Sequence, residues 1–328
     1  MCKYPLSSLP ENMLKSTNII TTSSFCLGDA IHRHPPTLGL GSNTCIQDAF
    51  NLAWKISLVH RNLAAPSLLK TYNTERQPIA AALVTESNFI LRLDLELWGS
   101  MGLQPYTPSP SPPSPTATTN TKISHSTTQA LLKSASAEGK QRRKELSTRI
   151  RSLHRELHAL GTAMGQLYPP SSTAICTADE PAPFVPSPGE LANPYQNYTP
   201  CTYPGRRLPH VLLGPGSRVP GPLTSTLDIA GKGAFCLFTG IGGEGWVSAA
   251  AAVQKRFGTR VTVATVGRGC MWADTYLEWE EKSGVEEDGC VLVRPDYFVA
   301  WRAGSSGQEV ERLGRVMSAI LGVGGVGS

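Results

Sequence analysis

The spacing of apolar residues in the first third of the chain predicts helices. Residues 48–61 form one such helix, because apolar side chains recur there at helical intervals. These positions are Phe50, Leu52, Ala53, Ile56 and Val59. Ala65-Pro66-Ser67 should end this helix, and a second pattern runs from Ser67 to about Trp98, with a break near Pro78. Residues 17–28 read as one or two short strands ending at Gly28.

The last third of the chain alternates buried-strand and helix patterns. Strands are predicted at 210–213, 234–239, 260–266, 290–294 and 298–302, and helices at 246–257, 274–282 and 308–321. The order β-α-β-α-β-β-α is typical of a thioredoxin-like domain, with a parallel βαβ half and an antiparallel last pair. Where a thioredoxin carries two cysteines, this chain has residues 240–246, GIGGEGW. The pattern therefore predicts the fold without the redox chemistry.

The middle of the chain has a different composition. Residues 105–115 contain six prolines, and a Thr/Ser/Asn run continues to Thr128, so a disordered or extended insertion is expected. A charged helix follows, with a stripe at Leu146, Ile150, Leu153, Leu157 and Leu160. That stripe needs a partner surface, and packing on the same chain is favoured over a short coiled coil.

These patterns divide an α/β chain into five parts. We expect the remainder of a Rossmann-like FAD-binding domain at 1–102, a disordered insertion at 103–137, an amphipathic helix at 138–162, a linker at 163–202 and a thioredoxin-like domain at 203–328. In this interpretation the first part lacks the N-terminal strand and GxGxxG turn of such a domain.

Charge and targeting signals narrow the function classes. The net charge is +5, but residues 138–158 supply most of the excess, with seven Lys/Arg against three Asp/Glu. A surface for nucleic acid is therefore not expected. The sequence shows neither a signal-peptide pattern nor a membrane span, which predicts a cytoplasmic protein and makes the sequon at Asn197 a chance match.

Eight cysteines are scattered and none forms a CxxC pair, so reduced thiols are expected. A pair between Cys176 and Cys201 would require secretion. Cys26, His32 and His34 could suggest a metal site, but His-x-His in a loop lacks further ligands at metal-binding spacing. We therefore predict no metal site.

Residues 28–55, GDAIHRHPPTLGLGSNTCIQDAFNLAWK, combine a stiff glycine loop with a helix start. Gly39 and Gly41 permit close backbone approach, and Asn43 is a good N-cap residue. The first amides of the helix would favour an anion or an electron-rich carbonyl group, and Asp29 could accept hydrogen bonds from ligand hydroxyls. The residue types alone fit a ligand-binding loop and a structural turn equally well.

The same stretch resembles the flavin-contacting motif of class A flavoprotein aromatic hydroxylases, close to the phenol and chlorophenol monooxygenase branch. Its pattern is roughly GDAxHxxPPxxGxGxNxxxxDAxNLAWKL, and sixteen positions match between Gly28 and Lys55. Tyr72, Glu75 and Arg76 match a further YxxER segment. Runs near the C-terminus also resemble this branch: GRRLPHVLL, STLDIAGKGAFCLFTG, GWVSAA and VLVRPDYFVAWR.

The resemblance implies an FAD cofactor. Asp29 would hydrogen-bond the ribityl chain, and Pro36 with the backbone from Gly39 to Asn43 would line the isoalloxazine ring. The positions carried over as cofactor-binding are Gly28, Asp29, Pro36, Gly39, Gly41, Ser42 and Asn43. The implied reaction hydroxylates a small phenolic substrate with NAD(P)H and O₂ through a flavin C4a-hydroperoxide, and the family context implies a possible homodimer. No catalytic residue is assigned.

Two hypotheses about activity remain open. The chain is either a flavin-dependent monooxygenase by descent or a truncated, inactive relative that serves as a packing or dimerisation module. Because the GxGxxG turn, the DG motif and most of the substrate sheet have no counterpart upstream of Gly28, we expect this chain alone to bind FAD weakly or not at all.

Several residues outside the loop carry structural expectations. Glu75 and Arg76 are expected to form an ion pair with each other. Trp246 and Trp301 are expected in the core. Arg206, Arg207 and His210 would seat the C-terminal domain on the flavin domain.

Overall fold

The computed structural model describes residues 24–103, 126–217 and 221–323. The chain forms two compact units. Within the described residues, the first comprises residues 28–44, 80–103 and 126–159, and the second comprises residues 24–27, 45–79, 160–217 and 221–323. The strand predicted at 17–28 lies mostly outside the described residues, and Gly28 itself begins a short 3₁₀ turn.

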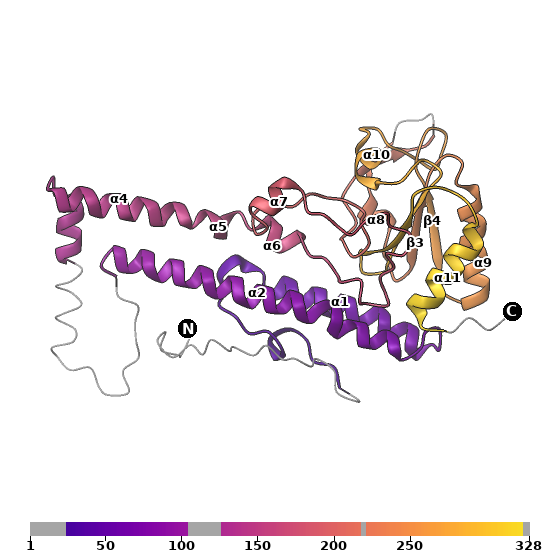
Figure 1. Ribbon diagram of the computed structural model, residues 1–328, viewed down its shortest axis with the longest axis horizontal. Helices are drawn as coiled ribbons and strands as arrows, with labels where there is room; N and C mark the ends of the chain where they lie inside the picture. The colour runs from indigo at the N-terminus through magenta and orange to yellow at the C-terminus, as the bar shows by residue number, and fades with distance from the viewer. Residues whose placement is uncertain (1–23, 104–125, 218–220, 324–328) are drawn as a thin grey trace. The chain divides into compact units, whose positions relative to one another are not determined.

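The first unit is built from helices and short turns. It contains η2 (Gly28–Ala30), η3 (Thr37–Gly39), the first residues of α1, the second part of α2, a helix at 126–133, α4 (Ala137–Ser152) and α5 (His154–Leu157). Helix α4 runs alongside the second part of α2 (Figure 1), and Arg149 pairs there with Glu96. The Arg155 guanidinium pairs with Glu86 and lies 4.4 Å from the centre of the Phe89 ring.

The predicted amphipathic helix at 138–162 is interrupted in the structure. It divides into α4, α5 and α6 (Leu160–Met164), and Ile150, Leu157 and Leu160 are 54%, 77% and 53% exposed. The prediction that the stripe packs on the chain was therefore wrong for these three side chains. The predicted insertion lies outside the described residues at 104–125, and residues 126–133 are helical rather than extended.

Helices α1 (Gly41–His60) and α2 (Ser67–Ser100) differ from their predicted forms. Helix α1 begins seven residues before Asp48, and α2 continues through Pro78. The predicted apolar stripe is wrong for Phe50, Ala53 and Ile56, which are exposed, whereas Leu52 is buried and Val59 packs against the core. The buried face of α1 instead combines apolar and polar side chains: Asp48, Asn51, Leu52, Trp54, Lys55 and Leu58. Pattern reading assigned these polar residues to the solvent.

The second unit contains a four-stranded sheet in the order β4-β3-β6-β7. Strands β3 (Phe235–Thr239) and β4 (Val261–Thr265) are parallel and are joined through α9 (Glu244–Phe257). Strands β6 (Cys290–Val293) and β7 (Val299–Ala303) form an antiparallel pair. This confirms the predicted parallel βαβ half and antiparallel last pair.

Both faces of this sheet are covered, which explains why its strands are apolar throughout. Side chains alternate along β3, so Phe235 and Leu237 enter one core while Cys236 and Phe238 enter the other. The first core includes Trp246 from α9 and Met317 from α11 (Glu309–Leu321). The second core includes Trp279 from α10 (Glu278–Ser283).

Short elements complete the second unit. A small sheet joins β2 (Thr224–Ser225), β1 (Leu212–Pro215) and β5 (Trp272–Ala273), and α8 (Thr226–Ile229) follows β2. The region predicted as a linker holds α7 (Pro188–Ala192), whose start is fixed by a capping box between Ser187 and Glu190. The two-residue strands gave no sequence signal, because two residues cannot show a period.

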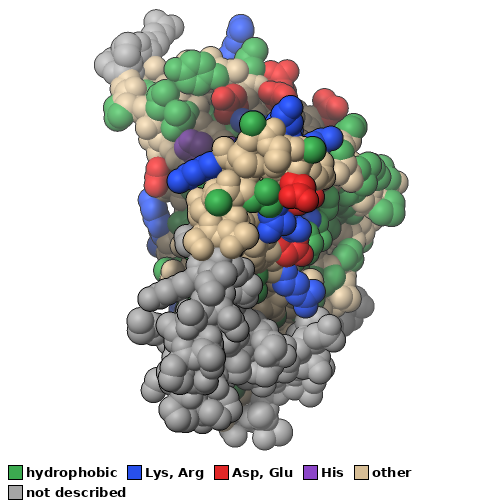
Figure 2. Space-filling view, turned by 90° about the vertical axis from the view of Figure 1, so that its left-hand side faces the viewer, with side chains coloured by type: hydrophobic (Ala, Val, Ile, Leu, Met, Phe, Trp, Pro, Cys, Tyr) green, Lys and Arg blue, Asp and Glu red, His purple; other side chains and the backbone are tan. Residues whose placement is uncertain are grey.

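The described surface shows no single dominant charge on the face drawn in Figure 2, where Lys and Arg side chains mix with Asp, Glu and hydrophobic ones. Among the described residues, no helix is both long enough and apolar enough to cross a membrane.

Candidate flavin loop and buried ion network

Residues 28–32 form a tight turn in the first unit that requires glycine. Gly28 is buried with φ of 60°, and its carbonyl accepts hydrogen bonds from the amides of Ile31 and His32 at 2.9 and 3.0 Å. Ile31 and His32 are buried, whereas Asp29 between them and Gly28 is exposed. The turn therefore holds the Asp29 carboxylate at the surface on a fixed backbone.

The next segment of the loop has an unusual backbone. Leu38 and Gly39 both have positive φ, 68° and 64°. A branched side chain rarely adopts this conformation, and such strain is retained where the surrounding structure holds it. Thr37 supplies one such restraint, because its buried hydroxyl donates to the Ser87 carbonyl at 2.9 Å. A Cβ added at Gly39 would meet no atom within 4 Å, so the space beside it is open.

Helix α1 starts directly after this strained pair. The Thr44 amide donates to the Leu40 carbonyl at 2.9 Å, so the amides of residues 41–43 precede the repeating helical bonds. Asn43 does not act as the predicted N-cap, because it lies inside α1 and its Nδ2 donates to the Gly39 carbonyl at 3.3 Å. Gly41 packs on His34, whose Cε1 lies 3.4 Å from the position of an added Cβ.

Of the seven residues predicted to bind the cofactor, five are exposed: Asp29, Pro36, Gly39, Ser42 and Asn43. Gly28 is buried and Gly41 is half-buried. All seven belong to one continuous loop and helix start within the first unit. His34 is half-buried, and its Nδ1 lies 2.7 Å from the Pro35 carbonyl.

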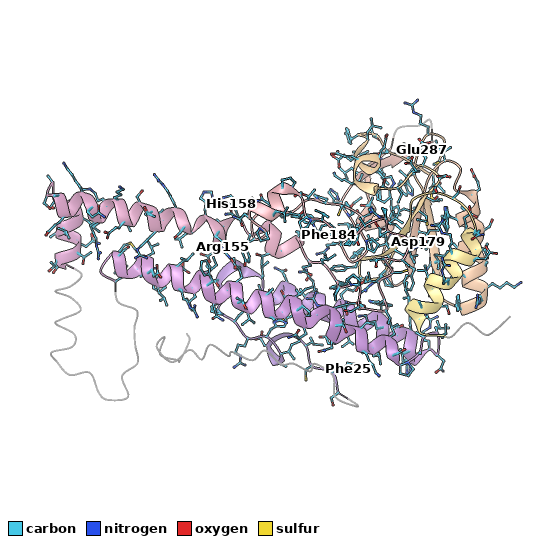
Figure 3. All side chains as sticks on the ribbon, viewed as in Figure 1. Phe25, Arg155, His158, Asp179, Phe184 and Glu287 are labelled. Carbon is cyan, nitrogen blue, oxygen red and sulfur yellow. The ribbon has the colours of Figure 1, made fainter. Side chains whose placement is uncertain are left out.

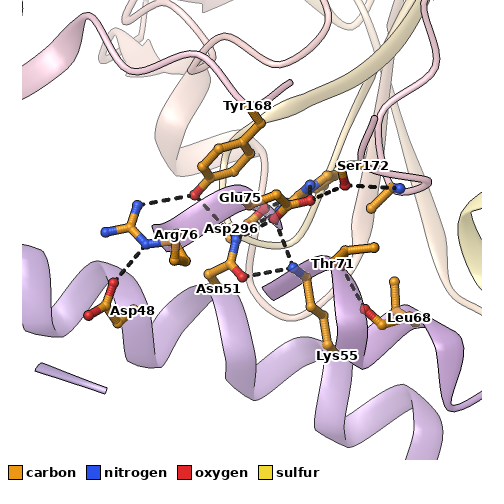
Figure 4. A network of polar contacts seen from close by, with 12 residues as sticks. Asp48, Asn51, Lys55, Leu68, Thr71, Glu75, Arg76, Tyr168, Ser172 and Asp296 are labelled. Carbon is orange, nitrogen blue, oxygen red and sulfur yellow. Dashed lines mark hydrogen bonds and ion pairs between the residues drawn. The ribbon is translucent and has the colours of Figure 1, made fainter. Parts of the chain in front are cut away.

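The second half of the same motif lies in the second unit and faces inward. Glu75 is the centre of a buried network (Figure 4), in which it accepts from Lys55 Nζ at 2.8 Å and from Asn51 Nδ2 at 2.7 Å. Two Arg294 nitrogens donate to the two Glu75 oxygens at 2.6 and 2.8 Å. Ser172 Oγ adds a bond of 2.6 Å to the same carboxylate.

Two further carboxylates complete the network. Asp296 accepts from Arg294 Nε at 2.9 Å and from Asn51 Nδ2 at 3.1 Å. Asp48 accepts from Arg76 Nε at 2.7 Å. The predicted ion pair between Glu75 and Arg76 is therefore wrong. As adjacent helical residues, they point in different directions and serve different partners.

Burial and charge pairing shift the protonation of these groups. Burial lowers the pKa of Lys55 to about 8, against the opposing charge of Glu75. Burial alone would raise the pKa of Glu75, but the charges of Arg294 and Lys55 hold it well below its usual range. Burial also raises the pKa of the Tyr168 hydroxyl to about 12. Glu75 is thus a stable anion and Tyr168 a neutral hydroxyl, a state suited to fixing structure rather than to proton transfer.

The network is absent from the sequence predictions, although one signal for it exists. Asp48, Asn51 and Lys55 recur at helical spacing, so they share a face of α1. A polar stripe on a helix normally indicates a solvated face. Only the charges contributed by Glu75 and Arg294, distant in sequence, turn this stripe into a buried one.

Other predicted residues pack within the second unit. Trp246 and Trp301 are fully buried with rings 5.7 Å apart, as predicted. Trp301 Nε1 donates to Asp179 at 2.6 Å, and the Arg206 guanidinium lies 4.9 Å from the Phe184 ring (Figure 3).

Arg206, Arg207 and His210 were predicted to seat the C-terminal domain on the flavin domain, but the contacts observed for Arg206 and His210 lie within the second unit. Arg206 pairs with Glu190 at 2.6 Å, so it fixes the 165–199 segment of its own unit. His210 Nδ1 lies 2.7 Å from Ser225 Oγ, also within this unit. No cluster of three His, Cys, Asp or Glu residues suited to a metal ion occurs in the described ranges. Cys176 and Cys201 are free thiols.

Comparison with known proteins places these two regions in a family context. The FAD binding domain family matches residues 18–87, and the family described as aromatic-ring hydroxylase, C-terminal, matches residues 201–323. Phenol 2-monooxygenase of Pseudomonas sp. (strain EST1001) is 39% identical over 85% of this chain and 42% of its own length. The 2,4-dichlorophenol 6-monooxygenase of Cupriavidus pinatubonensis (strain JMP 134 / LMG 1197) is 39% identical over 92% of this chain and 46% of its own length.

Solved structures show the same relationship. The flavin-dependent monooxygenase PieE, in complex with FAD and substrate, matches 93% of this chain and 48% of its own with a TM-score of 0.77 and 34% identity. Aklavinone-11 hydroxylase, with FAD and aklavinone, matches 93% of this chain and 44% of its own at a TM-score of 0.62 and 27% identity. The chain spans about half the length of the curated relatives it matches. On these matches, residues 18–87 resemble the FAD binding domain family and residues 201–323 resemble the C-terminal part of aromatic-ring hydroxylases, and the chain is similar to phenol and chlorophenol monooxygenases over about half of their length.

Proposed function

We propose that residues 28–43 bind the isoalloxazine end of FAD, in a monooxygenase that hydroxylates a phenolic ring with NAD(P)H and O₂. The observation that carries this proposal is the loop of residues 36–43, which is largely exposed, has a strained backbone at Leu38 and ends at the first amides of α1. The named relatives act on phenol and 2,4-dichlorophenol, and the matched PieE structure contains FAD. When bound, FAD would supply the redox chemistry.

The residues of the loop fit this group. The backbone amides from Gly41 to Asn43 and the positive end of α1 would stabilise negative charge on an electron-rich carbonyl edge. The open space beside Gly39 would let a flat ring approach the backbone. The exposed Asp29 carboxylate would accept hydrogen bonds from the ribityl hydroxyls. The chain's own contribution is thus to orient the ring and favour its reduced form.

The second unit supports a separate structural role. We propose that residues 203–328 form a thioredoxin-like domain, supported by the strand order and by the loop GIGGEGW in place of two cysteines. The buried network ties α1 and α2 to this domain through Arg294 and Asp296. The network therefore explains why one family motif contains both loop residues and deeply buried charges.

One observation favours a second function, that of a packing or dimerisation module without catalysis. Ile46 and Phe50 lie four residues apart on α1 and are 66% and 37% exposed, and Ile56 further along the helix is 41% exposed. An exposed apolar stripe of this kind marks a surface that another protein segment covers.

Both functions are tested by titrating FAD into the purified full chain. Flavin fluorescence measures FAD binding, and size-exclusion chromatography with light scattering measures the oligomeric state. Because the chain alone is expected to bind FAD weakly, the loop proposal expects weak but saturable quenching. Asp29→Asn should weaken this quenching further, and Asp228→Asn, a change of an exposed acid on α8, should leave it unchanged. Equal quenching by both variants would contradict it. A chain that binds no FAD yet forms a dimer lost in Ile46→Glu would support the packing function instead.

A further inference from the structure

A pocket of about 760 Å³ lies in the second unit. Its walls come from the ends of β3 and β4, the start of β6, helix α10 and the loops between them. In open α/β sheets, ligands bind outside the carboxyl ends of parallel strands, where successive connections leave a strand in opposite directions. The pocket lies at the carboxyl ends of the two parallel strands β3 and β4, next to the antiparallel strand β6.

Glycines shape the pocket wall. A Cβ at Gly240 would lie 2.5 Å from the Glu287 carbonyl and 2.9 Å from the Val266 carbonyl. Gly267 has φ of 149°, a conformation that L side chains rarely adopt. These two positions require glycine and bring the loops after β3 and β4 close to the loop before β6. The volume lies within the range of pockets that hold small organic ligands.

The pocket has an apolar floor and an acidic rim. Phe238, Val266 and Trp279 are buried among its lining residues, and the Phe238 and Trp279 rings lie 4.9 Å apart. The ionisable residues of the lining are four acids and one base: Asp274, Glu280, Glu286, Glu287 and Arg268. Glu287 is labelled in Figure 3. This combination suits a ligand with an apolar body and a positive charge.

A buried acceptor points to the same ligand. Asp274 Oδ2 accepts from the Glu280 amide at 2.9 Å, whereas Asp274 Oδ1 is buried and has no hydrogen-bond partner within the described residues. A buried carboxylate oxygen without a partner is costly, so a donor from a ligand would satisfy it. The carboxylates of the pocket do not form a cage for a metal ion, since no such cluster exists in the described chain.

The loop after β3 raises a competing reading. Gly240, Gly242 and Gly245 have the GxGxxG spacing of a phosphate-binding turn between a strand and a helix. Two acids argue against an anion here. Glu244 occupies the first turn of α9, and a Cβ at Gly245 would lie 2.7 Å from the Glu309 carboxyl carbon. These two carboxylates already supply the negative charge that the N-terminus of α9 favours, so a pyrophosphate is not expected to bind there.

We propose that this pocket binds a small organic cation with an aromatic or aliphatic body. The apolar part lies on Phe238, Val266 and Trp279, and the ammonium group lies among Asp274 and the rim glutamates. This site is separate from the flavin loop, so the proposal holds whether or not the chain binds FAD.

Titration of the full chain with 3-phenylpropylammonium, 3-phenylpropionate and ADP, followed by amide chemical shifts, tests the proposal. We expect saturable shifts at Gly240, Gly267 and Gly289 with the cation, and weaker binding of both anions. Tighter binding of ADP or 3-phenylpropionate than of the cation would overturn the assignment, as would the absence of saturable shifts with the cation.

Two variants with a matched control locate the charge. Glu280→Gln should weaken cation binding about two- to fivefold, whereas Glu281→Gln, next to it on α10 but outside the pocket, should leave it unchanged. Ile241→Lys places a positive charge at the exposed rim and should weaken binding at least about tenfold. Circular dichroism verifies that each variant is folded. Equal affinities for Glu280→Gln and Glu281→Gln would place the ligand elsewhere and refute the proposal.

Discussion

The stretch from Gly28 to Lys55, which contains the proposed flavin loop, has two regions that differ in their surroundings. Residues 28–43 belong to the first unit and leave most of their predicted cofactor contacts exposed. Residues 48–55 belong to the second unit and hold Asp48, Asn51 and Lys55 at 0%, 1% and 0% exposure. A single run of residues that match the family pattern thus combines an exposed loop with buried charged side chains.

This difference indicates two reasons why a residue can belong to the motif: it can serve ligand binding, or it can stabilise the fold. The loop stores backbone strain at Leu38 and uses glycine at position 39 for a second positive φ. The network satisfies each buried charge with several short hydrogen bonds, and removal of one partner leaves the others uncompensated. Substitutions in the loop should therefore change ligand binding, and substitutions in the network should change folding.

The largest effect is expected for Glu75→Gln. This change leaves Lys55 and Arg294 buried without their shared anion, so the free energy of unfolding should fall by about 3–5 kcal/mol. Urea unfolding followed by circular dichroism measures the loss. Glu281→Gln, an exposed acid on α10, is the matched control and should unfold like the wild type. A loss below about 1 kcal/mol for Glu75→Gln would show that the network does not stabilise the second unit.

The pH dependence of stability is the next largest effect. The folded pKa of Glu75 is lower than its usual value of 4.5, so the unfolded chain binds more protons below that pH. Stability from Glu75 is therefore complete above pH 4.5 and is lost as the pH falls further, by up to about 1.4 kcal/mol per pH unit. Urea unfolding at several acidic pH values should show a shallower slope for Glu75→Gln. An identical slope in both proteins would contradict this assignment.

For Gly39→Ala, in the loop, a smaller decrease in the free energy of unfolding is expected. The added methyl group meets no neighbour, but φ of 64° costs an L residue roughly 1–2 kcal/mol. Thermal unfolding of the first unit should therefore begin at a lower temperature. Gly304→Ala is a control, because an added Cβ there also meets open space and its φ is not positive. If both variants melt alike, the loop is not strained at Gly39.

The smallest effect on folding is expected for Asp29→Asn. Its side chain is exposed, so the unfolding midpoint should not change. FAD affinity, measured by flavin fluorescence, should nevertheless fall, because a neutral amide accepts hydroxyl donors less strongly than a carboxylate. A lower midpoint with unchanged FAD affinity would reverse the roles assigned to the two regions.

The sequence predicted the C-terminal elements well because their apolar runs are short and bounded by glycine or proline. Strand β3 and helix α11 each lie within one residue of the predicted limits. Helix α1 was predicted less well, because Gly41 and Ser42 are weak helix formers and yet begin it. Phe50 and Ile56 are exposed, so the spacing of apolar residues on α1 did not show which face of the helix is buried.

The sequence predicted the loop of the candidate site but did not predict the buried ion network. Asp29 and Gly39 carry a local pattern, since the turn around them depends on neighbouring residues. The partners of Lys55 are Glu75 and Arg294, and no rule based on local spacing connects residues so far apart. Long-range charge compensation is a property of the folded chain alone.

The hydrogen bonds between Glu75 and Arg294 join residues 219 positions apart. During synthesis at about 5–20 residues per second, helix α2 waits roughly 10–45 s after Glu75 emerges before Arg294 is made. Throughout that interval Lys55 and Glu75 can find each other but lack their third partner. The final closure of α1 and α2 onto the sheet is therefore a late step of folding, and chaperones that shelter nascent helices would act on this chain before the C-terminal domain is complete.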